Sequence, residues 1–282
     1  MTKFDIELVG KVGSMALINK EYNDINYNVI ARLSKELKPG YIWVTSGAAE
    51  IGRLDFIKRN GYELDGDSSE VKTDYAAQGQ SILMSNYRQY MDSRYSLRQI
   101  LVEHQHFNNE VKREYLKKLL IRCPKQNAIP IINYNDPLST EEIIKMELIQ
   151  LGNSENYVHG IDNDETASQI ACLVKSKRLL IMTSVDGIYS DVNDKDSLVK
   201  FISGATVSEV VQNIEEYQKA CYGASRKGAG GAKAKLEYIK DPVMNGTEVI
   251  IANSKYKLKD ILSGDAPSTK IGVDLGVKSK FI

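Results

Sequence analysis

Two lysines and one aspartate, far apart in the sequence, are the residues best suited to holding a phosphate group. Lys11 follows the first apolar segment, Lys235 follows a glycine-rich stretch near the other end, and Asp164 lies between them in the chain. An aspartate placed between two lysines can direct both ammonium groups toward a polyphosphate. We therefore predict that the fold brings these three side chains together.

Asp164 closes the segment Gly160–Asp164, where we expect a loop to become a helix over Glu165–Lys175. Two carboxylates and one amide lie within three residues there. Aspartate, asparagine and threonine also satisfy the free amide groups at a helix start, so a plain helix cap remains the structural alternative for this segment.

Three glycine-containing loops are candidates for binding an anion. Gly10–Ser14 follows a predicted strand over Phe4–Val9, Ser46 and Gly47 follow another over Tyr41–Val44, and Gly223–Gly231 precedes a predicted helix. Backbone amides and a helix start can together bind phosphate. Tight or flexible turns, and a solvated lysine, are the alternatives. The loops match neither a Walker A sequence nor a nucleophile elbow.

Apolar periodicity predicts the elements that would hold these loops, as one large α/β domain or two lobes. We expect Leu54–Asp74 to be an exposed loop or excursion, Leu138–Asn156 to be an insertion or lid, and Lys145–Gly160 to be an inserted segment. The other predicted strands are Gln99–Val102, Ala128–Ile132, Arg178–Met182 and Glu248–Ala252, with a terminal hairpin from Ser268; the other predicted helices are Tyr27–Leu37, Ala76–Met91, Asn108–Leu120, Val207–Tyr217 and Ala232–Lys240.

Polar residues follow two of the predicted strands. Asn133–Asp136 comes directly after one of them, where a small-molecule site is expected, although turns favour the same residues. After another, Asp186 begins a turn, and Tyr189 is expected either to line an adenine pocket or to pack beneath that turn.

Composition limits the classes of partner. Lys plus Arg and Asp plus Glu both number 37, so no bulk attraction to nucleic acid or a membrane is expected. The three cysteines and three histidines show no metal-ligand spacing; we expect buried cysteines, and we place His104 and His106 at the surface. Without a signal-peptide pattern or an apolar run of spanning length, the protein is expected to be cytoplasmic.

Together these segments resemble the amino acid kinase superfamily, and within it the glutamate 5-kinases of the short form without a C-terminal PUA domain. The resemblance covers almost the whole chain. It is carried by Lys11–Ser14, Val44–Ala48, Ile129–Asp136 with Thr140–Ile143, Gly160–Asp164, Val185–Tyr189 and Gly228–Leu236, in the order of the family.

The resemblance implies an α/β fold, a three-layer αβα sandwich with a mainly parallel central sheet. It implies one amino acid kinase domain over residues 1–282, with an acceptor-binding lobe to about residue 165 and an ATP-binding lobe after it. Lys11 and Lys235 would stabilise the transferring phosphoryl group, and Asp164 would orient them. The implied substrate-binding residues are Ser46, Gly47, Asp136 and Asn163; the implied ATP-binding residues are Lys11, Gly13, Thr183, Ser184, Asp186, Tyr189, Gly230, Gly231 and Lys235.

The implied activity is ATP-dependent, Mg²⁺-assisted phosphorylation of the γ-carboxylate of L-glutamate, the first step of proline biosynthesis, in a homo-oligomer (dimer or tetramer). Ser184 replaces the usual aspartate beside the nucleotide, 108–120 matches the family helix only loosely, and the connection from Asp136 to Gly160 is long. Another acceptor (amino acid, carbamate, nucleoside monophosphate or phosphonate) therefore stays open. A catalytically silent regulatory module is the third alternative; retention of both lysines and Asp164 argues against it.

Overall fold

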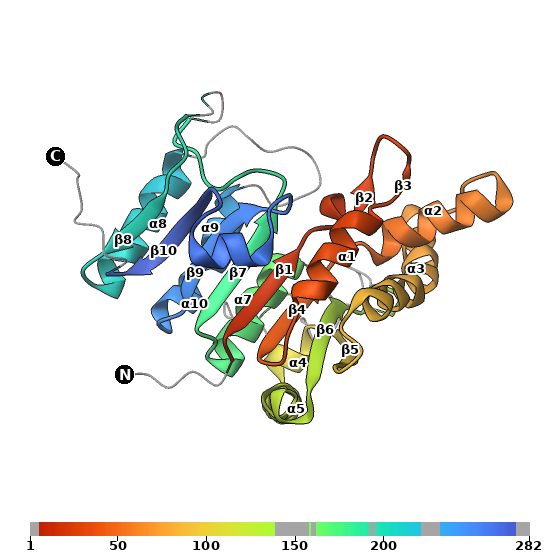
Figure 1. The fold of residues 1–282 in the computed structure, drawn as a ribbon, viewed down its shortest axis with the longest axis horizontal. Helices are drawn as coiled ribbons and strands as arrows, with labels where there is room; N and C mark the ends of the chain where they lie inside the picture. Colours follow the sequence, from red (N-terminus) through yellow and green to blue (C-terminus); the bar gives the residue numbers. More distant parts are fainter. Residues whose placement is uncertain are drawn as a thin grey trace. The chain divides into compact units, whose positions relative to one another are not determined.

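The computed structural model describes residues 6–138, 158, 162–191, 194, 196–220 and 232–274 (Figure 1). Contacts divide the chain into two compact units. Unit 1 comprises Met1–Lys11, Gly40–Ile42 and Asp164–Ile282, and unit 2 comprises Val12–Pro39 and Trp43–Asn163. The assignment of acceptor and nucleotide to separate lobes stays a prediction.

Unit 1 is built on strands that follow one another in the order β1, β7, β9, β10 and β8, with the first residues of β4 beside β1. β9 pairs in parallel with β7, and β10 pairs in parallel with β8 but antiparallel with β9. The strands are β1 (Leu8–Val12), β4 (Tyr41–Thr45), β7 (Arg178–Thr183), β8 (Phe201–Gly204), β9 (Glu248–Asn253) and β10 (Ser268–Val273).

Helices flank these strands in unit 1. Each buries apolar side chains against the sheet, as α8 does with Val210 and Ile214. The helices are α7 (Asn163–Val174), α8 (Val207–Ala220), α9 (Ala232–Tyr238), α10 (Lys240–Met244) and α11 (Leu258–Ser263).

Unit 2 places β6 (Ala128–Tyr134) between β5 (Ser96–Val102) and β4, with both pairings parallel. A small antiparallel pair, β2 (Ile18–Asn19) and β3 (Asp24–Ile25), precedes the first helix. The helical elements are η1 (Ser14–Ala16), α1 (Tyr27–Glu36), α2 (Ala48–Asn60), α3 (Ser68–Tyr90), α4 (Gln105–Asn108), α5 (Glu110–Arg122) and η2 (Pro124–Gln126).

Two glycines set the distance between α2 and α3. A Cβ atom at Gly52 would lie 1.8 Å from the backbone oxygen of Tyr75, and one at Gly79 would lie 1.8 Å from the backbone oxygen of Ala48. No residue with a side chain fits at either position, so the two helix backbones pack in direct contact.

A buried polar contact ties α3 to β4 in unit 2. The indole Nε1 of Trp43 donates to the Tyr87 hydroxyl at 3.1 Å, and Thr45 Oγ1 lies 3.0 Å from the same oxygen. Burial raises the pKa of Tyr87 to about 12, although these two hydrogen bonds lower it. Tyr87 is therefore neutral at physiological pH, and its hydroxyl has partners in the core.

Several predicted boundaries were wrong. Lys11 lies inside β1, not in a turn after it, because a buried carboxylate compensates its charge there. Leu54–Asp74 is mostly α2 and α3, with only a short connection between them. The sequence shows no clear helical spacing of apolar residues there, because the two helices pack through glycines and their outer faces are polar. Ser268 begins β10, which lies between β9 and β8 and is no hairpin appended to the end, and β8 was not predicted.

The structure also tests the predicted burial of His104 and of the cysteines. His104 is 1% exposed, so its placement at the surface was wrong. Cys123 is buried, Cys172 is partly exposed, and Cys221 lies outside the described residues. Most of the predicted insertion or lid over Leu138–Asn156 and of the inserted segment Lys145–Gly160 also lies outside them.

The fold class is confirmed: a mainly parallel sheet flanked by helices. In the part of the chain that the structure describes, no helix combines the length and the apolar character that crossing a bilayer requires.

Candidate functional site

Asp164 forms ion pairs with both lysines singled out in the sequence. Its Oδ1 lies 2.7 Å from Lys11 Nζ, and its Oδ2 lies 2.8 Å from Lys235 Nζ. Lys11 comes from β1, Asp164 from the first turn of α7, and Lys235 from α9, all within unit 1. We call these three residues the triad.

Burial and charge act in opposite directions on the Asp164 carboxyl. Removal from water raises its pKa, but the Lys11 and Lys235 ammonium groups outweigh this effect, and the net pKa is lowered. The carboxylate therefore stays ionised, and the triad carries a net charge of one positive unit. Its place in the first turn of a helix adds a favourable interaction with the helix dipole.

In unit 2, hydrogen bonds link the side chains of Asn163, Ser46 and Asn133, which belong to segments predicted to bind the substrate. Asn163 Nδ2 donates to Ser46 Oγ at 3.0 Å and to Asn133 Oδ1 at 3.3 Å. Asn133 Nδ2 in turn donates to Gln80 Oε1 at 2.8 Å. Among the described residues, Asn163 Oδ1 and Gln80 Nε2 have no hydrogen-bond partner although both atoms are buried. One acceptor and one donor are thus available to a ligand.

Asp136 lies near the end of β6, in the same unit, with Lys72 of α3 as its ion-pair partner at 3.7 Å. Burial raises the pKa of Asp136, and Lys72 offsets only part of this effect. A half-buried carboxylate with one long ion pair has capacity to bind a second cationic group, such as the ammonium of an amino acid.

The two short loops predicted to bind an anion meet within unit 2. Gly47 adopts a left-handed backbone (φ 100°) immediately before α2, and a Cβ atom there would lie 3.6 Å from Ser14 Cα. The Ser46 amide donates to the Val12 carbonyl at 3.2 Å. Gly13 precedes η1 in the first of these loops, so the predicted positions Gly13 and Gly47 belong to adjoining segments.

The residues after β7, predicted to contact ATP, surround Asp186 in unit 1. Its carboxylate accepts from Asn253 Nδ2 at 2.9 Å and from the Tyr256 hydroxyl at 3.2 Å, and pairs with Lys255 Nζ at 2.9 Å. Burial raises its pKa, but these partners outweigh burial and lower it. The carboxylate is thus ionised and holds the segments after β7 and β9 together.

The remaining predicted nucleotide residues differ in their exposure. Thr183 Oγ1 accepts from the Val185 amide at 2.9 Å, Ser184 is exposed, and Tyr189 is partly exposed and bridges to Leu198. The predicted positions Gly230 and Gly231 lie outside the described residues.

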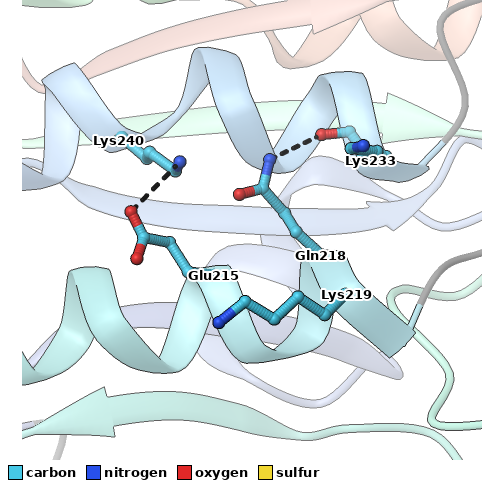
Figure 2. A pocket seen from close by; sticks show the side chains of 5 residues that line it. All are labelled: Glu215, Gln218, Lys219, Lys233 and Lys240. Carbon is cyan, nitrogen blue, oxygen red and sulfur yellow. Dashed lines mark hydrogen bonds and ion pairs between the residues drawn. The ribbon is translucent and has the colours of Figure 1, made fainter.

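A shallow hollow in unit 1 lies where α8 faces α9 and α10 (Figure 2). Gln218 Nε2 donates to the Lys233 carbonyl at 3.0 Å and to Glu237 at 2.9 Å, and Lys240 pairs with Glu215 at 3.5 Å. These contacts fix α9, the helix that carries Lys235. Lys219 completes the lining of the hollow, whose polar groups hold helices together.

Sequence reasoning missed several side chains that the structure adds to these clusters. Gln80 and Lys72 lie on a helix that was expected to be partly loop, so no sequence pattern singled them out. Asn253 ends β9, the parallel neighbour of β7, and Lys255 and Tyr256 follow it; polar residues at strand ends were a usable signal. The added residues are Lys72, Gln80, Asn253, Lys255 and Tyr256.

The chain is similar in sequence to known glutamate 5-kinases. A glutamate 5-kinase from Streptococcus suis is 29% identical over 255 residues, which make up 88% of this chain and 64% of that protein. The chain therefore spans less than two thirds of that relative. A glutamate 5-kinase from Clostridium perfringens is 27% identical over 272 residues, and the match covers 92% of each chain.

Among solved structures, a carbamate kinase from Giardia lamblia bound to AMP-PNP is similar with a TM-score of 0.58 and 16% identity, covering 95% of this chain and 99% of that one. At this identity the likeness concerns the fold. The model of the amino acid kinase family matches residues 8–253. This match extends over most of the sequence, and the chain belongs to the amino acid kinase family.

Proposed function

We propose that the chain is an ATP-dependent kinase that phosphorylates the γ-carboxylate of L-glutamate to glutamyl 5-phosphate by direct in-line transfer. The observation that carries the proposal is the triad, in which Asp164 holds two lysine ammonium groups within 2.8 Å. A module that only binds a ligand has no need of two cations held in this way, which favours an enzyme over a silent regulatory domain.

The chemistry suits this arrangement. A carboxylate acceptor is already nucleophilic, so the transfer requires alignment and charge neutralisation and no strong general base. A carboxylate oxygen of the acceptor attacks the γ-phosphorus, the bond from that phosphorus to the β–γ bridging oxygen breaks, and ADP leaves with the electron pair. Lys11 and Lys235 stabilise the negative charge on the transferred group and on the leaving oxygen.

Ser46, Asn133, Asn163 and Asp136 of unit 2, which we call the acceptor cluster, favour an amino acid as the acceptor. The hydroxyl of Ser46 and the amides around Asn163 suit a carboxylate, whereas Asp136 suits an ammonium group. L-glutamate carries both groups, while carbamate and nucleoside monophosphates lack the ammonium. The names of the relatives point to the same acceptor.

Mg²⁺ is expected to arrive with the nucleotide. Both carboxylate oxygens of Asp164 are engaged by lysines, and the described residues contain no group of three histidine, cysteine or acidic side chains arranged to hold a metal. Magnesium in kinases is bound largely by the phosphates themselves and by water. Its contribution would be to neutralise phosphate charge.

A panel of acceptors tests the proposal. ATP consumption is measured with L-glutamate, L-aspartate, carbamate, UMP and a phosphonate, and hydroxylamine traps any acyl phosphate as a hydroxamate. We expect strong turnover and hydroxamate with L-glutamate alone. Turnover with carbamate or UMP and none with glutamate would assign the enzyme to another acceptor, and turnover with none of them would favour the silent module.

A further inference from the structure

In unit 2, the side-chain amide of Asn108 forms hydrogen bonds with both backbone groups of Val158, as a neighbouring strand would. Asn108 Nδ2 donates to the Val158 carbonyl at 2.8 Å, and the Val158 amide donates to Asn108 Oδ1 at 3.0 Å. An asparagine side chain has the same donor and acceptor as a peptide group, so both backbone groups of Val158 are satisfied at once. We call this pair of hydrogen bonds the amide clamp.

Asn108 is itself firmly held. It is the last residue of α4, its backbone amide donates to the His104 carbonyl at 3.1 Å, and its Nδ2 lies 3.4 Å from His104 Nδ1. His104 and Phe107 are buried at 1% and 5% exposure, which anchors the short helix in the core. The clamp is therefore attached to a rigid element.

The same region is tied to the segment that carries Asp136. The Asn135 amide donates to the Val102 carbonyl at 2.9 Å, and Asn135 Nδ2 donates to Glu103 Oε1 at 2.6 Å. Glu103 lies two residues before the start of α4. One short stretch thus contacts both the residue before Asp136 and a residue five positions before Asn163.

We propose that Asn108 is a positioning residue for the acceptor site. Its amide clamp on Val158 fixes the chain on its approach to Asn163, whose amide reaches Ser46 and Asn133. The inference rests on the proposed function, because it assigns Asn108 a role in binding the acidic acceptor. It acts through Asn163, without contact with the substrate.

The expected effect follows from populations. Without the clamp, Val158 is no longer held to α4, and the position of Asn163, five residues later, is less restricted. Only a fraction of the positions of Asn163 then binds the acceptor, and the apparent dissociation constant rises by the inverse of that fraction. Loss of two ordinary hydrogen bonds corresponds to about a tenfold effect. The triad and the residues around Asp186 belong to unit 1, so the KM for ATP should not change.

The test compares two adjacent asparagines in the whole chain. Asn108→Ala removes the clamp, whereas Asn109→Ala removes the cap of α5, where Asn109 Oδ1 accepts from the Lys112 amide at 3.0 Å. We expect Asn108→Ala to raise the KM for L-glutamate about tenfold with the KM for ATP and Tm near the parent values. We expect Asn109→Ala to lower Tm and leave both KM values unchanged.

Two further measurements make the test decisive. Asn108→Asp keeps the shape but replaces the donor with an oxygen facing the Val158 carbonyl, so it should raise the acceptor KM as alanine does, and it serves if Asn108→Ala does not fold. Hydrogen exchange at the Val158 amide, measured without substrates, should speed up in Asn108→Ala and not in Asn109→Ala.

The outcomes separate the two claims. Unchanged exchange at Val158 in Asn108→Ala would overturn the clamp, and faster exchange with an unchanged acceptor KM would overturn the positioning role. A parent chain that phosphorylates no acid would overturn the proposed function, and the exchange measurement, which needs no turnover, would still report on the clamp.

Discussion

Asp164 is both buried and ionised, two properties that are seldom found together in one side chain. Its burial alone raises the carboxyl pKa, yet its two lysine partners reverse the direction. Removing one member of a buried charge cluster leaves the others uncompensated, so each member affects stability as well as catalysis. A functional test at this scale must therefore separate folding from turnover.

The lysines provide that test. We expect Lys11→Ala and Lys235→Met to lower kcat by on the order of 100-fold or more, because in the proposed function each removes a cation that stabilises the transferring phosphoryl group. Steady-state kinetics measures the loss, and near-UV circular dichroism checks the fold.

Lys219→Met is the control, since this exposed lysine of α8 has no place in the triad and should keep parent activity. Near-normal turnover in a folded Lys11→Ala variant would contradict the proposed role of the triad.

Sequence reasoning found the residues of the triad but misjudged their settings. Lys11 was recognised by its type and place, while its burial inside a strand depends on a partner more than 150 positions away, which no local pattern encodes. His104 was placed at the surface because its neighbours are polar; the structure buries it beneath α4. Long-range pairing decides burial for such residues.

At the scale of elements, the contact between α2 and α3 links packing to the acceptor cluster. Gly79 lies against α2, and the next residue, Gln80, bonds to Asn133. α2 itself begins directly after Gly47. A change in the distance between the two helices would therefore displace both the loop before α2 and the amide chain behind Asn163.

Gly79→Ala should expose this constraint. Alanine normally stabilises a helix interior relative to glycine by about 1 kcal/mol, but here its Cβ would collide with a backbone oxygen, and overpacking costs about 1–3 kcal/mol. We expect a net loss of stability in denaturant unfolding, together with a raised KM for the acceptor.

Ser81→Ala, at an exposed position of the same helix, is the control and should unfold within about 0.5 kcal/mol of the parent. A Gly79→Ala protein that is as stable as the parent would show that the two helices separate freely.

Elements with continuous apolar runs were predicted to within a residue or two. β4, β7 and β9 are buried on both faces, and their runs of branched residues are visible in the sequence. The start of α3 and the whole of β8 were missed, because a polar, half-exposed segment has no comparable signal. The parallel pairing of β8 with β10 depends on tertiary contacts alone.

For the molecule as a whole, the triad makes the stability of the fold depend on pH in the acid range. The folded-state pKa of Asp164 is lowered from its ordinary value of 3.8, so the unfolded chain binds more protons at this site than the folded one near that pH. The stabilisation is present above pH 3.8 and is lost as pH falls through the folded-state pKa.

Asp164→Asn should reveal this dependence. At pH 7 we expect it to lower the free energy of unfolding by on the order of 3 kcal/mol, because the buried Lys11 and the partly exposed Lys235 both lose this ion pair. The difference from the parent should shrink as pH falls below 3.8, because the unfolded parent then gains a proton that the folded parent lacks until its lowered pKa is reached.

Urea unfolding at pH 7 and at pH 3 measures both differences. Asp65→Asn, in an exposed loop, should change little at either pH. A difference that stays constant between the two pH values would contradict the assignment of the lowered pKa to Asp164.

In the proposed function, the half-buried carboxyl of Asp136 couples binding of an amino acid to the release of a proton. Since its pKa is raised, a larger share of the empty protein carries this group protonated than an exposed aspartate would. An arriving ammonium stabilises the charged form and expels that proton into the buffer. Affinity for a zwitterion should therefore strengthen as the medium becomes less acidic, while an uncharged analogue would bind without releasing protons.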